Sequence, residues 1–393
     1  MRSFIFSAIV ILASYVIPQS RAVASVEKGA RIFVAKVHPA HGDLTTEDFK
    51  QLADAGFTIV ARKWTTTLAG KPGISFGEYA NRAASVGLSV MMFESGLTNA
   101  KDDADRTINR NGLPTRYTRP QSLYAWQALT ERLIEYAKLS KTHPNIEGVN
   151  LDFEIYDHHK TDGFCESYDD QTFREFFVSM GRNVPDPLPA PSERQQYLIK
   201  TQMYQMYIGY QIDLIAERAA DLRKAIDAIN PKFQIGIYGW GVLIPPIIHQ
   251  LATPQAPALI LDAMTYGRSV YSNAFEGGYD ADRPDKEALK WSLDTVKMGI
   301  AAAHQRYDNV IYLAGHYPQS PGPKDQYKFT AKQAFQSAAF GEGYWIWTDW
   351  KAPKDWATKR EWYDAMMDYF GKANAALDAK NWKWAENEPA TVK

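Results

Sequence analysis

The chain has 393 residues, with 44 Lys and Arg residues against 45 Asp and Glu residues and a formal net charge of −1. A charge this balanced gives no reason to expect nucleic acid or an anionic membrane surface as a partner. The only cysteine, Cys165, excludes an intramolecular disulfide, and the length suits one barrel domain, a fold that runs from about 200 to over 400 residues.

Residues 1–24 are typical of a secretory signal. Arg2 gives a positive start, residues 4–16 form an apolar run, and Ala22 to Ala24 give a small-residue cleavage site. The apolar run is shorter than the roughly 20 residues that a membrane-spanning helix needs. We therefore expect an exported protein, periplasmic or secreted, with no membrane association after signal removal. Residues 25–380 would form the folded domain and residues 381–393 a loosely held tail.

Short apolar segments alternate with longer amphipathic segments along the expected domain. The predicted strands are 31–37, 58–62, 89–93, 148–153, 234–238, 259–265, 310–314 and 344–348. The predicted helices are 45–55, 75–86, 122–141, 195–230, 284–305, 330–340 and 357–379, with a weak helix at 242–251. This alternation indicates a parallel sheet wrapped by helices. Eight repeats favour an α/β fold of the closed (β/α)8 TIM-barrel type, as a single domain, over a doubly wound open sheet.

Local signals accompany the helices and the loops. Thr45 and Ser192 each begin a capping-box pattern. A near-helical spacing relates Tyr197, Tyr204, Tyr207 and Tyr210, which predicts a buried helix face rather than a binding stripe. Long connections follow several strands, at 65–74, 95–120, 156–191 and 267–283. All lie at the carboxyl ends of strands, where the active sites of such barrels are built.

The segment 147–157 carries the strongest functional signal. Polar Asn150, Asp152 and Glu154 alternate with apolar residues from 149 to 153. This period of two predicts a strand that sends the three polar side chains to one side. Because a buried carboxylate without a partner is costly, acids at the end of an apolar strand indicate an active site rather than packing.

The spacing of Asp152 and Glu154 restricts the chemistry. Side chains two residues apart on a strand lie about 7 Å apart on one face, whereas ordinary glycosidases hold two carboxyls on opposite sides of the sugar. Glu154 can protonate a leaving oxygen, but Asp152 is poorly placed to attack the anomeric carbon. The nucleophile would then be the acetamido oxygen of a 2-acetamido sugar, which is the substrate-assisted exception.

Residues 147–154, EGVNLDFE, resemble the fourth-strand signature D-G-x-D-x-D-x-E of chitinase-type (family-18-like) glycoside hydrolases. The resemblance implies that Glu154 is the general acid and base and that Asp152 orients the acetamido group. Residues 264–266, Met-Thr-Tyr, match the Met-x-Tyr of the same family, which implies that the Tyr266 hydroxyl holds the acetamido oxygen. Trp347 matches the Trp that floors the subsite on the last strand. Hyaluronidase-like enzymes carry a similar Asp-x-Glu pair and are a related possibility.

The sequence departs from the chitinase pattern at several positions. Glu147 and Asn150 replace the first two aspartates of the signature, and Gly267 stands where an aspartate often follows Met-x-Tyr. No Ser-x-Gly-Gly occurs on the third predicted strand. The amide of Asn150 can hydrogen-bond Asp152 but cannot take up charge from it.

Further candidates for substrate contact lie at the ends of other predicted strands. Asp262 shares its parity with Tyr266, so we expect both to face the barrel interior, where Asp262 would be available as a second carboxylate. The remaining candidates are Glu94, Lys63, Trp240, His316 and Asp349. The pair His158 and His159 lacks a further ligand at metal spacing, which favours a solvated loop. We expect neither a metal nor a cofactor.

The residues and the resemblance together predict a retaining, substrate-assisted glycoside hydrolase that cleaves a β-linked glycan containing N-acetylhexosamine. Its partner would be an oligo- or polysaccharide, and the chain would act as a monomer. Two alternatives stay open. One is a conventional two-carboxylate glycosidase on another polysaccharide, which pairs Glu154 with Asp262, Glu94 or Asp349. The other is a sugar-binding barrel without catalysis.

Overall fold

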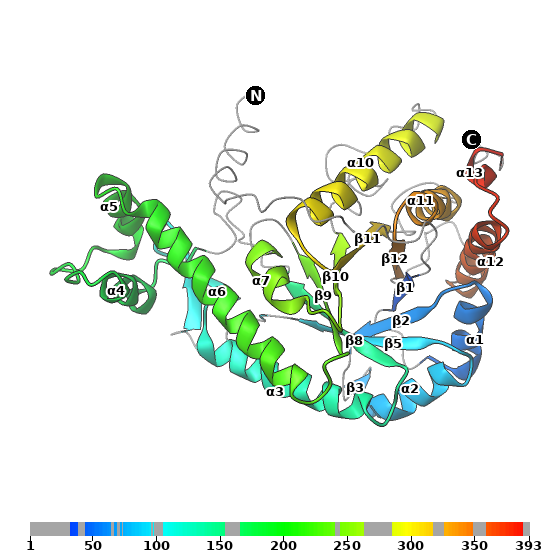
Figure 1. Ribbon diagram of the computed structural model, residues 1–393, viewed down its shortest axis with the longest axis horizontal. Helices are drawn as coiled ribbons and strands as arrows, with labels where there is room; N and C mark the ends of the chain where they lie inside the picture. The colour runs from blue at the N-terminus through cyan, green and yellow to red at the C-terminus, as the bar shows by residue number, and fades with distance from the viewer. Residues whose placement is uncertain are drawn as a thin grey trace.

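The computed structural model describes residues 32–37, 44–63, 67–68, 71–72, 74–95, 97, 105–153, 166–239, 244–262, 285–316, 326–348 and 359–387. The expected signal segment, residues 1–24, lies outside these ranges. Parallel strands form the centre of the molecule and helices surround them (Figure 1). None of the described helices is both long and apolar enough to cross a membrane.

Eight parallel strands make up the central sheet. They are β1 (Ile32–Val37), β2 (Ile59–Lys63), β5 (Ser89–Ser95), β8 (Ile146–Phe153), β9 (Gln234–Gly239), β10 (Ala258–Asp262), β11 (Val310–His316) and β12 (Gly343–Thr348). Their hydrogen-bonded order is β1-β12-β11-β10-β9-β8-β5-β2, and β1 also pairs with β2, so the order closes on itself. Each predicted strand overlaps one of them, and the predicted α/β class with a parallel sheet is confirmed.

A helix follows each of these strands along the chain. The helices are α1 (Thr46–Asp54), α2 (Phe76–Ala84), α3 (Leu123–Ser140), α6 (Tyr204–Asp227), α7 (Ile244–Leu251), α10 (Asp285–Arg306), α11 (Gln326–Phe340) and α12 (Lys359–Asp378). The segment expected to be a weak helix forms α7. Its two prolines fall in the first turn of that helix, where a missing N–H is tolerated.

Two helix-start predictions had different outcomes. Thr45 caps α1 in a capping box, since its Oγ1 accepts a hydrogen bond from Asp48 N at 3.2 Å and its own N–H donates to the Asp48 carboxylate at 2.9 Å. The cap predicted at Ser192 is wrong. That residue lies in a 3₁₀ turn, Pro191–Glu193, and α5 (Arg194–Lys200) begins after it without a side-chain cap. The helix predicted over 195–230 is also broken between α5 and α6, where Gln202 has a φ of 58°.

The barrel strands whose burial is described contribute side chains to two separate cores, as expected of parallel strands covered by helices. An outer core joins the strands to the helices, for example through Leu151 of β8 and Trp126 of α3. A separate inner core contains only strand residues, which identifies it as the barrel interior: Ile59, Ala61, Met91, Phe93, Tyr238, Leu259, Leu261, Leu313 and Trp345. The two cores therefore show which way the strand residues that belong to them point.

The C-terminal part of the chain packs on this barrel as far as it is described. Helix α13 (Trp384–Asn387) falls within the residues expected to form a loose tail. Its Trp384 is buried, with ring centroids 5.2 Å from Phe335 and 5.7 Å from Tyr369. Aromatic burial on this scale holds α13 in place.

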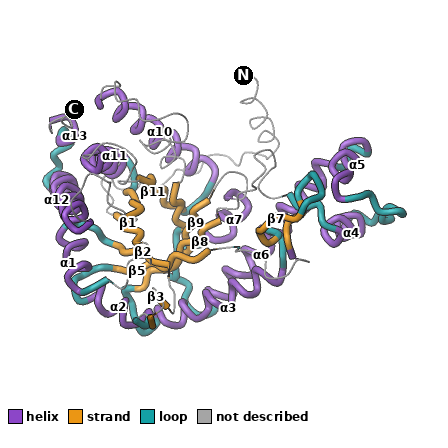
Figure 2. The backbone as a smooth tube through the Cα atoms, turned by 180° about the vertical axis from the view of Figure 1, so that it is seen from behind, coloured by secondary structure: helices purple, strands orange, loops and turns teal. Residues whose placement is uncertain are grey.

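Insertions after β5 and β8 build an extension beside the barrel, which we define as residues 105–118 and 166–210 (Figure 2). It consists of a hairpin of β6 (Arg106–Ile108) and β7 (Pro114–Thr118), helix α4 (Asp170–Ser179), α5 and the start of α6. It has its own hydrophobic core: Tyr168, Phe173, Phe176, Phe177, Leu198, Met203 and Tyr207. The connections predicted at 95–120 and 156–191 are thus not simple loops where they are described. The prediction of one buried tyrosine face holds only in part: Tyr207 is fully buried, whereas Tyr204 and Tyr210 of α6 and Tyr197 of α5 are half-buried and pack against this core.

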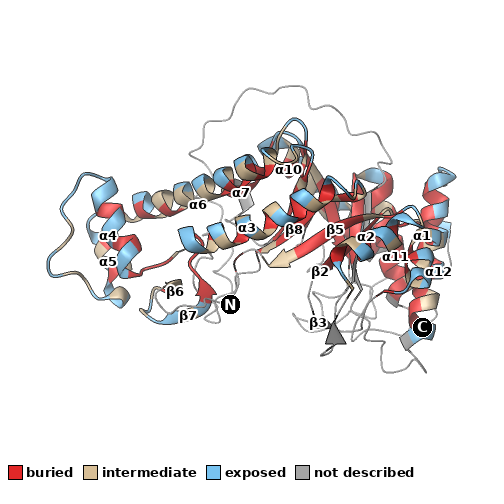
Figure 3. Ribbon diagram, turned by 90° about the horizontal axis from the view of Figure 1, so that it is seen from below, coloured by how far each residue is buried: buried red, intermediate tan, exposed pale blue. Residues whose placement is uncertain are grey.

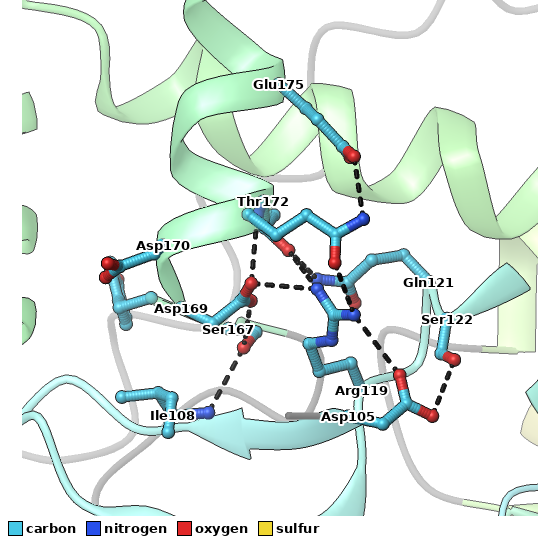
Figure 4. Close-up of polar contacts among 12 residues, drawn as sticks. Asp105, Ile108, Arg119, Gln121, Ser122, Ser167, Asp169, Asp170, Thr172 and Glu175 are labelled. Atoms are coloured by element: carbon cyan, nitrogen blue, oxygen red, sulfur yellow. Dashed lines mark hydrogen bonds and ion pairs between the residues drawn. The ribbon is translucent and has the colours of Figure 1, made fainter. Parts of the chain in front are cut away.

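One buried arginine joins the two insertions (Figure 4). Arg119, directly after β7, donates to Asp169 Oδ1 at 2.8 Å and to Asp105 Oδ1 at 3.2 Å. Asp169 also caps α4 by accepting from Thr172 N at 2.9 Å, and Ser167 donates to its other oxygen at 2.8 Å. Charge-assisted hydrogen bonds of this kind are stronger than neutral ones, so Arg119 fixes the start of α4 against the hairpin.

Replacing Arg119 with alanine should destabilise the protein by about 3 kcal/mol, because the buried Asp169 and the partly buried Asp105 would lose their cation. Urea denaturation followed by circular dichroism measures the loss. The control is Lys290→Ala, which breaks the exposed pair with Asp294 and should cost no more than about 1 kcal/mol. Similar small losses for both variants would show that Arg119 does not hold the extension together.

Candidate functional site

The carboxyl end of β8 places Asp152 at the mouth of the barrel. Val149 and Leu151 belong to the outer core, so the alternation of the strand sends Asn150 and Asp152 into the barrel interior. The contact of Asn150 Nδ2 with Met91 Sδ at 2.8 Å supports this direction, since Met91 is an inner-core residue. This direction agrees with the predicted common side of Asn150 and Asp152, whereas Glu154, the third residue of that prediction, lies outside the described residues.

A register shift at the start of β8 sets this alternation. Val90 pairs with Ile146, whereas Met91 pairs with Gly148, so Glu147 is the extra residue of a bulge. The Glu147 carboxylate accepts a hydrogen bond from Ser89 Oγ at 2.7 Å. Ser89 begins β5, so Glu147 lies at the amino end of the barrel, away from the mouth. Glu147, which stands at the position of the first aspartate in the chitinase signature, thus makes a structural contact away from the mouth.

Ser95 and Tyr238 flank Asp152, and neither was among the sequence candidates. Ser95 pairs with Asp152 from β5 and Tyr238 pairs with it from β9. Phe93 and Tyr238 are inner-core residues, so alternation places Ser95 on the interior face as well. The ring of Tyr238 lies 6.2 Å from that of Phe93 and 5.2 Å from that of Trp345. The parity of both residues was readable in the sequence, but the register that sets them beside Asp152 was not.

Asn150 lies one step deeper in the barrel than Asp152 and is fully buried. Its Oδ1 accepts no hydrogen bond from the described residues. A Cβ on Gly236, the residue opposite, would come within 1.9 Å of this Oδ1, so glycine at 236 makes room for the amide. Asn150 therefore supports the floor of the site from below and does not reach the surface of the mouth.

Glu94 faces helix α3 instead of the mouth. Met92, with the same parity, is an outer-core residue. The Glu94 carboxylate accepts a hydrogen bond from Tyr136 Oη at 3.1 Å and lies 3.5 Å from Arg132 Nε. Burial, together with the neighbouring Glu94 carboxylate, raises the pKa of Tyr136 well above its usual range, so the phenol keeps its proton as donor. The structure thus assigns Glu94 to strand–helix packing, in place of the expected substrate contact.

The prediction that Asp262 faces the barrel interior is wrong. On β10, Leu259 and Leu261 are inner-core residues, whereas Ile260 belongs to the outer core. Alternation therefore places Asp262 on the side of Ile260, toward the helices. An acid in that position does not face Asp152 across the barrel.

His316 is buried beneath α11 and does not line the mouth, contrary to its predicted substrate contact. Its Nε2 lies 2.9 Å from Ser337 Oγ of α11, and its ring packs near that of Tyr344 in the outer core. Full burial lowers the pKa of His316 to about 3, so the imidazole is neutral in the folded protein.

Several sequence candidates lie outside the described residues: Glu154, Tyr266, Trp240 and Asp349. Glu154 directly follows Phe153, the last residue of β8. Lys63 and Trp347 belong to β2 and β12, where they pair with Phe93 and Lys36, but their side chains also lie outside the description. Within the described ranges, no group of His, Cys, Asp or Glu residues has the arrangement of a metal site.

Comparison with solved structures supports the fold. A β-galactosidase from Halorubrum lacusprofundi superposes with a TM-score of 0.59 at 12% identity, covering 88% of this chain and 58% of that chain. A β-galactosidase from Marinomonas ef1 gives 0.54 at 11%, covering 91% and 62%. The catalytic domain of a β-amylase from Paenibacillus polymyxa gives 0.50 at 9%, covering 88% and 99%. The chain thus spans about three-fifths of the β-galactosidase chains. No protein-family model and no curated protein sequence matches it.

The buried neutral imidazole of His316 should make the protein less stable in acid. Between its usual pKa of 6.5 and about 3, the unfolded chain binds a proton at His316 that the folded chain does not, so stability falls as the pH drops through this range. Urea denaturation from pH 7 to pH 4 should show the native chain losing more stability than His316→Gln, whose side chain does not titrate. A stability difference that stays constant with pH would contradict this.

Proposed function

We propose that the chain is a retaining glycoside hydrolase built on a complete (β/α)8 barrel, with Asp152 and Glu154 as its acidic pair. The observation that carries this proposal is the interior placement of Asp152 at the carboxyl end of β8, the end at which barrel enzymes hold their catalytic groups. The glycosidase names of the structural neighbours agree with hydrolysis of a glycosidic bond. We propose export to the periplasm or medium and action as a monomer.

The proposed substrate is a β-linked glycan that contains N-acetylhexosamine. Glu154 protonates the glycosidic oxygen while the acetamido oxygen of the substrate attacks the anomeric carbon, which gives a cyclic oxazolinium ion. Asp152 orients the acetamido group and stabilises its developing positive charge, and Tyr266 holds its oxygen. Glu154 then removes a proton from water, which opens the ring with overall retention. Trp347, Trp240, Lys63 and Asp349 are the proposed contacts to the remaining sugars.

The placement of the other carboxylates favours this mechanism over a conventional one. A second carboxylate would have to face Glu154 from across the sugar. Glu94 contacts α3, and alternation turns Asp262 toward the helices, so two of the three expected partners point away from the mouth. Asp349 is the remaining partner for a conventional mechanism. The second candidate function is therefore a two-carboxylate glycosidase on another polysaccharide, and the β-galactosidase names of the structural neighbours favour it.

Replacing Glu154 with glutamine should lower kcat by roughly a hundredfold to ten-thousandfold on the N-acetylhexosamine glycan that the native chain cleaves, because the amide cannot donate the proton. A screen of such glycans followed by chromatography of the products measures the effect. Glu94→Gln is the matched control, since it makes the same change at an acid that faces α3, and should keep most of the activity. Equal activity of native chain and Glu154→Gln would reject the proposal.

A thiazoline inhibitor separates the two mechanisms. The compound imitates the cyclic intermediate, so it should inhibit the native chain competitively if the substrate supplies the nucleophile. Asp152→Asn should weaken this inhibition, because the carboxylate stabilises the charged ring. Cleavage of a glycan without acetamido groups, unaffected by the inhibitor and abolished by Asp349→Asn, would establish the two-carboxylate candidate instead.

A further inference from the structure

Helices α3 and α6 lie side by side on the outside of the barrel (Figure 3). Two side-chain contacts fix their alignment. Gln121 Nε2, just before α3, donates to Gln211 Oε1 of α6 at 3.1 Å, and Asn230 Nδ2, shortly after α6, donates to Ser140 Oγ at 2.8 Å. Both pairs are separated by 90 residues in the chain, so the two helices run parallel and keep the same register along their shared length.

A groove of about 460 Å³ lies between residues 123–131 of α3 and residues 218–221 of α6, and we call it the α3–α6 groove. Its floor is made by the buried Trp126 and the half-buried Thr130 and Arg218, whereas the other lining residues are exposed. Sites for small ligands have volumes of roughly 300–1,000 Å³. The groove is therefore large enough to hold a ligand of this kind.

The rim of the α3–α6 groove carries polar side chains that the fold does not use. Gln127 and Glu131 of α3 and Asp221 of α6 line the groove and are exposed. None of the three makes a hydrogen bond or an ion pair in the described part of the chain. Two carboxylates and one carboxamide are thus available to a ligand, and they come from both helices.

Arg218 brings hydrogen-bond donors into the same groove. Its Nη1 donates to Glu217 at 3.2 Å, the one hydrogen bond that its side chain makes to the described residues, and this leaves further N–H donors of the guanidinium. The two carboxylates disfavour an anionic ligand, and the arginine disfavours a small cation. A neutral ligand with several hydroxyl groups suits the groove, because each hydroxyl can donate to a carboxylate and accept from the guanidinium.

Trp126 connects the floor of the groove with the strand of the candidate site. Its ring centroid lies 5.9 Å from that of Phe153, the residue that follows Asp152 at the end of β8. Its Nε1 donates to Pro120 O at 2.7 Å, which fixes the indole beneath the start of α3. The groove therefore begins on the mouth side of the barrel, outside the strand that carries Asp152.

We propose that the α3–α6 groove binds neutral sugar units of the polysaccharide whose chain also occupies the candidate site. Leu123 offers apolar surface to the C–H face of a sugar ring, and Glu131 lies about 12 Å further along α3, so the groove suits a linear chain of sugars. This inference rests on the proposed function, which it deepens by adding a second contact to the same polymer. Two linked contacts on one polymer raise its apparent affinity above that of either site alone.

Binding to full-length Glu154→Gln tests the proposal without cleavage. Affinity gel electrophoresis measures retention by glycol chitin and by hydroxyethylcellulose, two neutral β-linked polymers. Gln127→Ala, Glu131→Ala and Asp221→Ala together should weaken retention by at least one of them about tenfold, because the second contact is lost. Alanine favours helices and the three side chains have no partner to lose, so thermal unfolding should show an unchanged fold.

The control removes the same charge from other outer helices. Gln305→Ala of α10, Glu47→Ala of α1 and Glu386→Ala of α13 alter exposed residues outside the groove, and together they should leave retention unchanged. Equal retention of the two triple variants, or no retention of Glu154→Gln by either neutral polymer, would overturn the inference.

Two further ligands test the chemistry of the groove. Polygalacturonate, an anionic polymer, should bind more weakly than the neutral polymers, and binding as tight as theirs would overturn the inference. Displacement of the neutral polymer by spermidine would identify an amine site instead. If Glu154→Gln keeps full activity in the separate cleavage assay while the groove variant loses retention, the catalytic proposal fails and the groove stands.

Discussion

Burial of the barrel strands on both faces decides the role of each residue at the mouth. Odd and even positions of a strand enter different cores, one inside the barrel and one beneath the helices. Asp152 has the interior parity of its strand, whereas Glu94 has the parity of Met92 and meets Tyr136 of α3. A shift of the strand register by one residue would exchange the residues that face the barrel interior with those that face the helices. In β8 the bulge at Glu147 sets this register before the functional residues are reached.

The extension adds a second level of organisation beside the mouth. Its small aromatic core around Tyr207 is built from the second insertion, residues 166–210. Arg119 links this insertion to the first one, because it binds acids from both insertions in a site that water hardly reaches. The clamp also caps α4 through Asp169. The same contacts hold the β6–β7 hairpin against the start of α4, so the stability of the extension depends on one set of buried polar contacts.

Sequence patterns predicted some elements and side-chain directions correctly and others wrongly. The alternation around Asp152 was predicted correctly, because a strand with apolar and polar residues at alternate positions can bury its apolar side chains in only one orientation. Asp262 was assigned to the wrong side because its parity was counted from Tyr266, beyond the end of β10 at Asp262. Helix α4 was missed although Phe173, Phe176 and Phe177 have helical spacing after the Asp169 cap, because the surrounding prolines and glycines favoured a loop. The position of His316 could not be predicted from the sequence either, because only its contact with Ser337 shows that it lies under α11.

The sequence by itself determined the alternation of strands and helices, the α/β class and the polar side of β8, because hydrophobic periodicity acts within a few residues. It also identified Thr45 as a cap, since the partner lies three residues away. Only the tertiary structure decided that Ser95 and Tyr238 flank Asp152, that Glu94 turns to α3, and that Arg119 joins two distant insertions. These contacts depend on strand register and on which core a side chain enters. Both are set by packing between segments far apart in the chain.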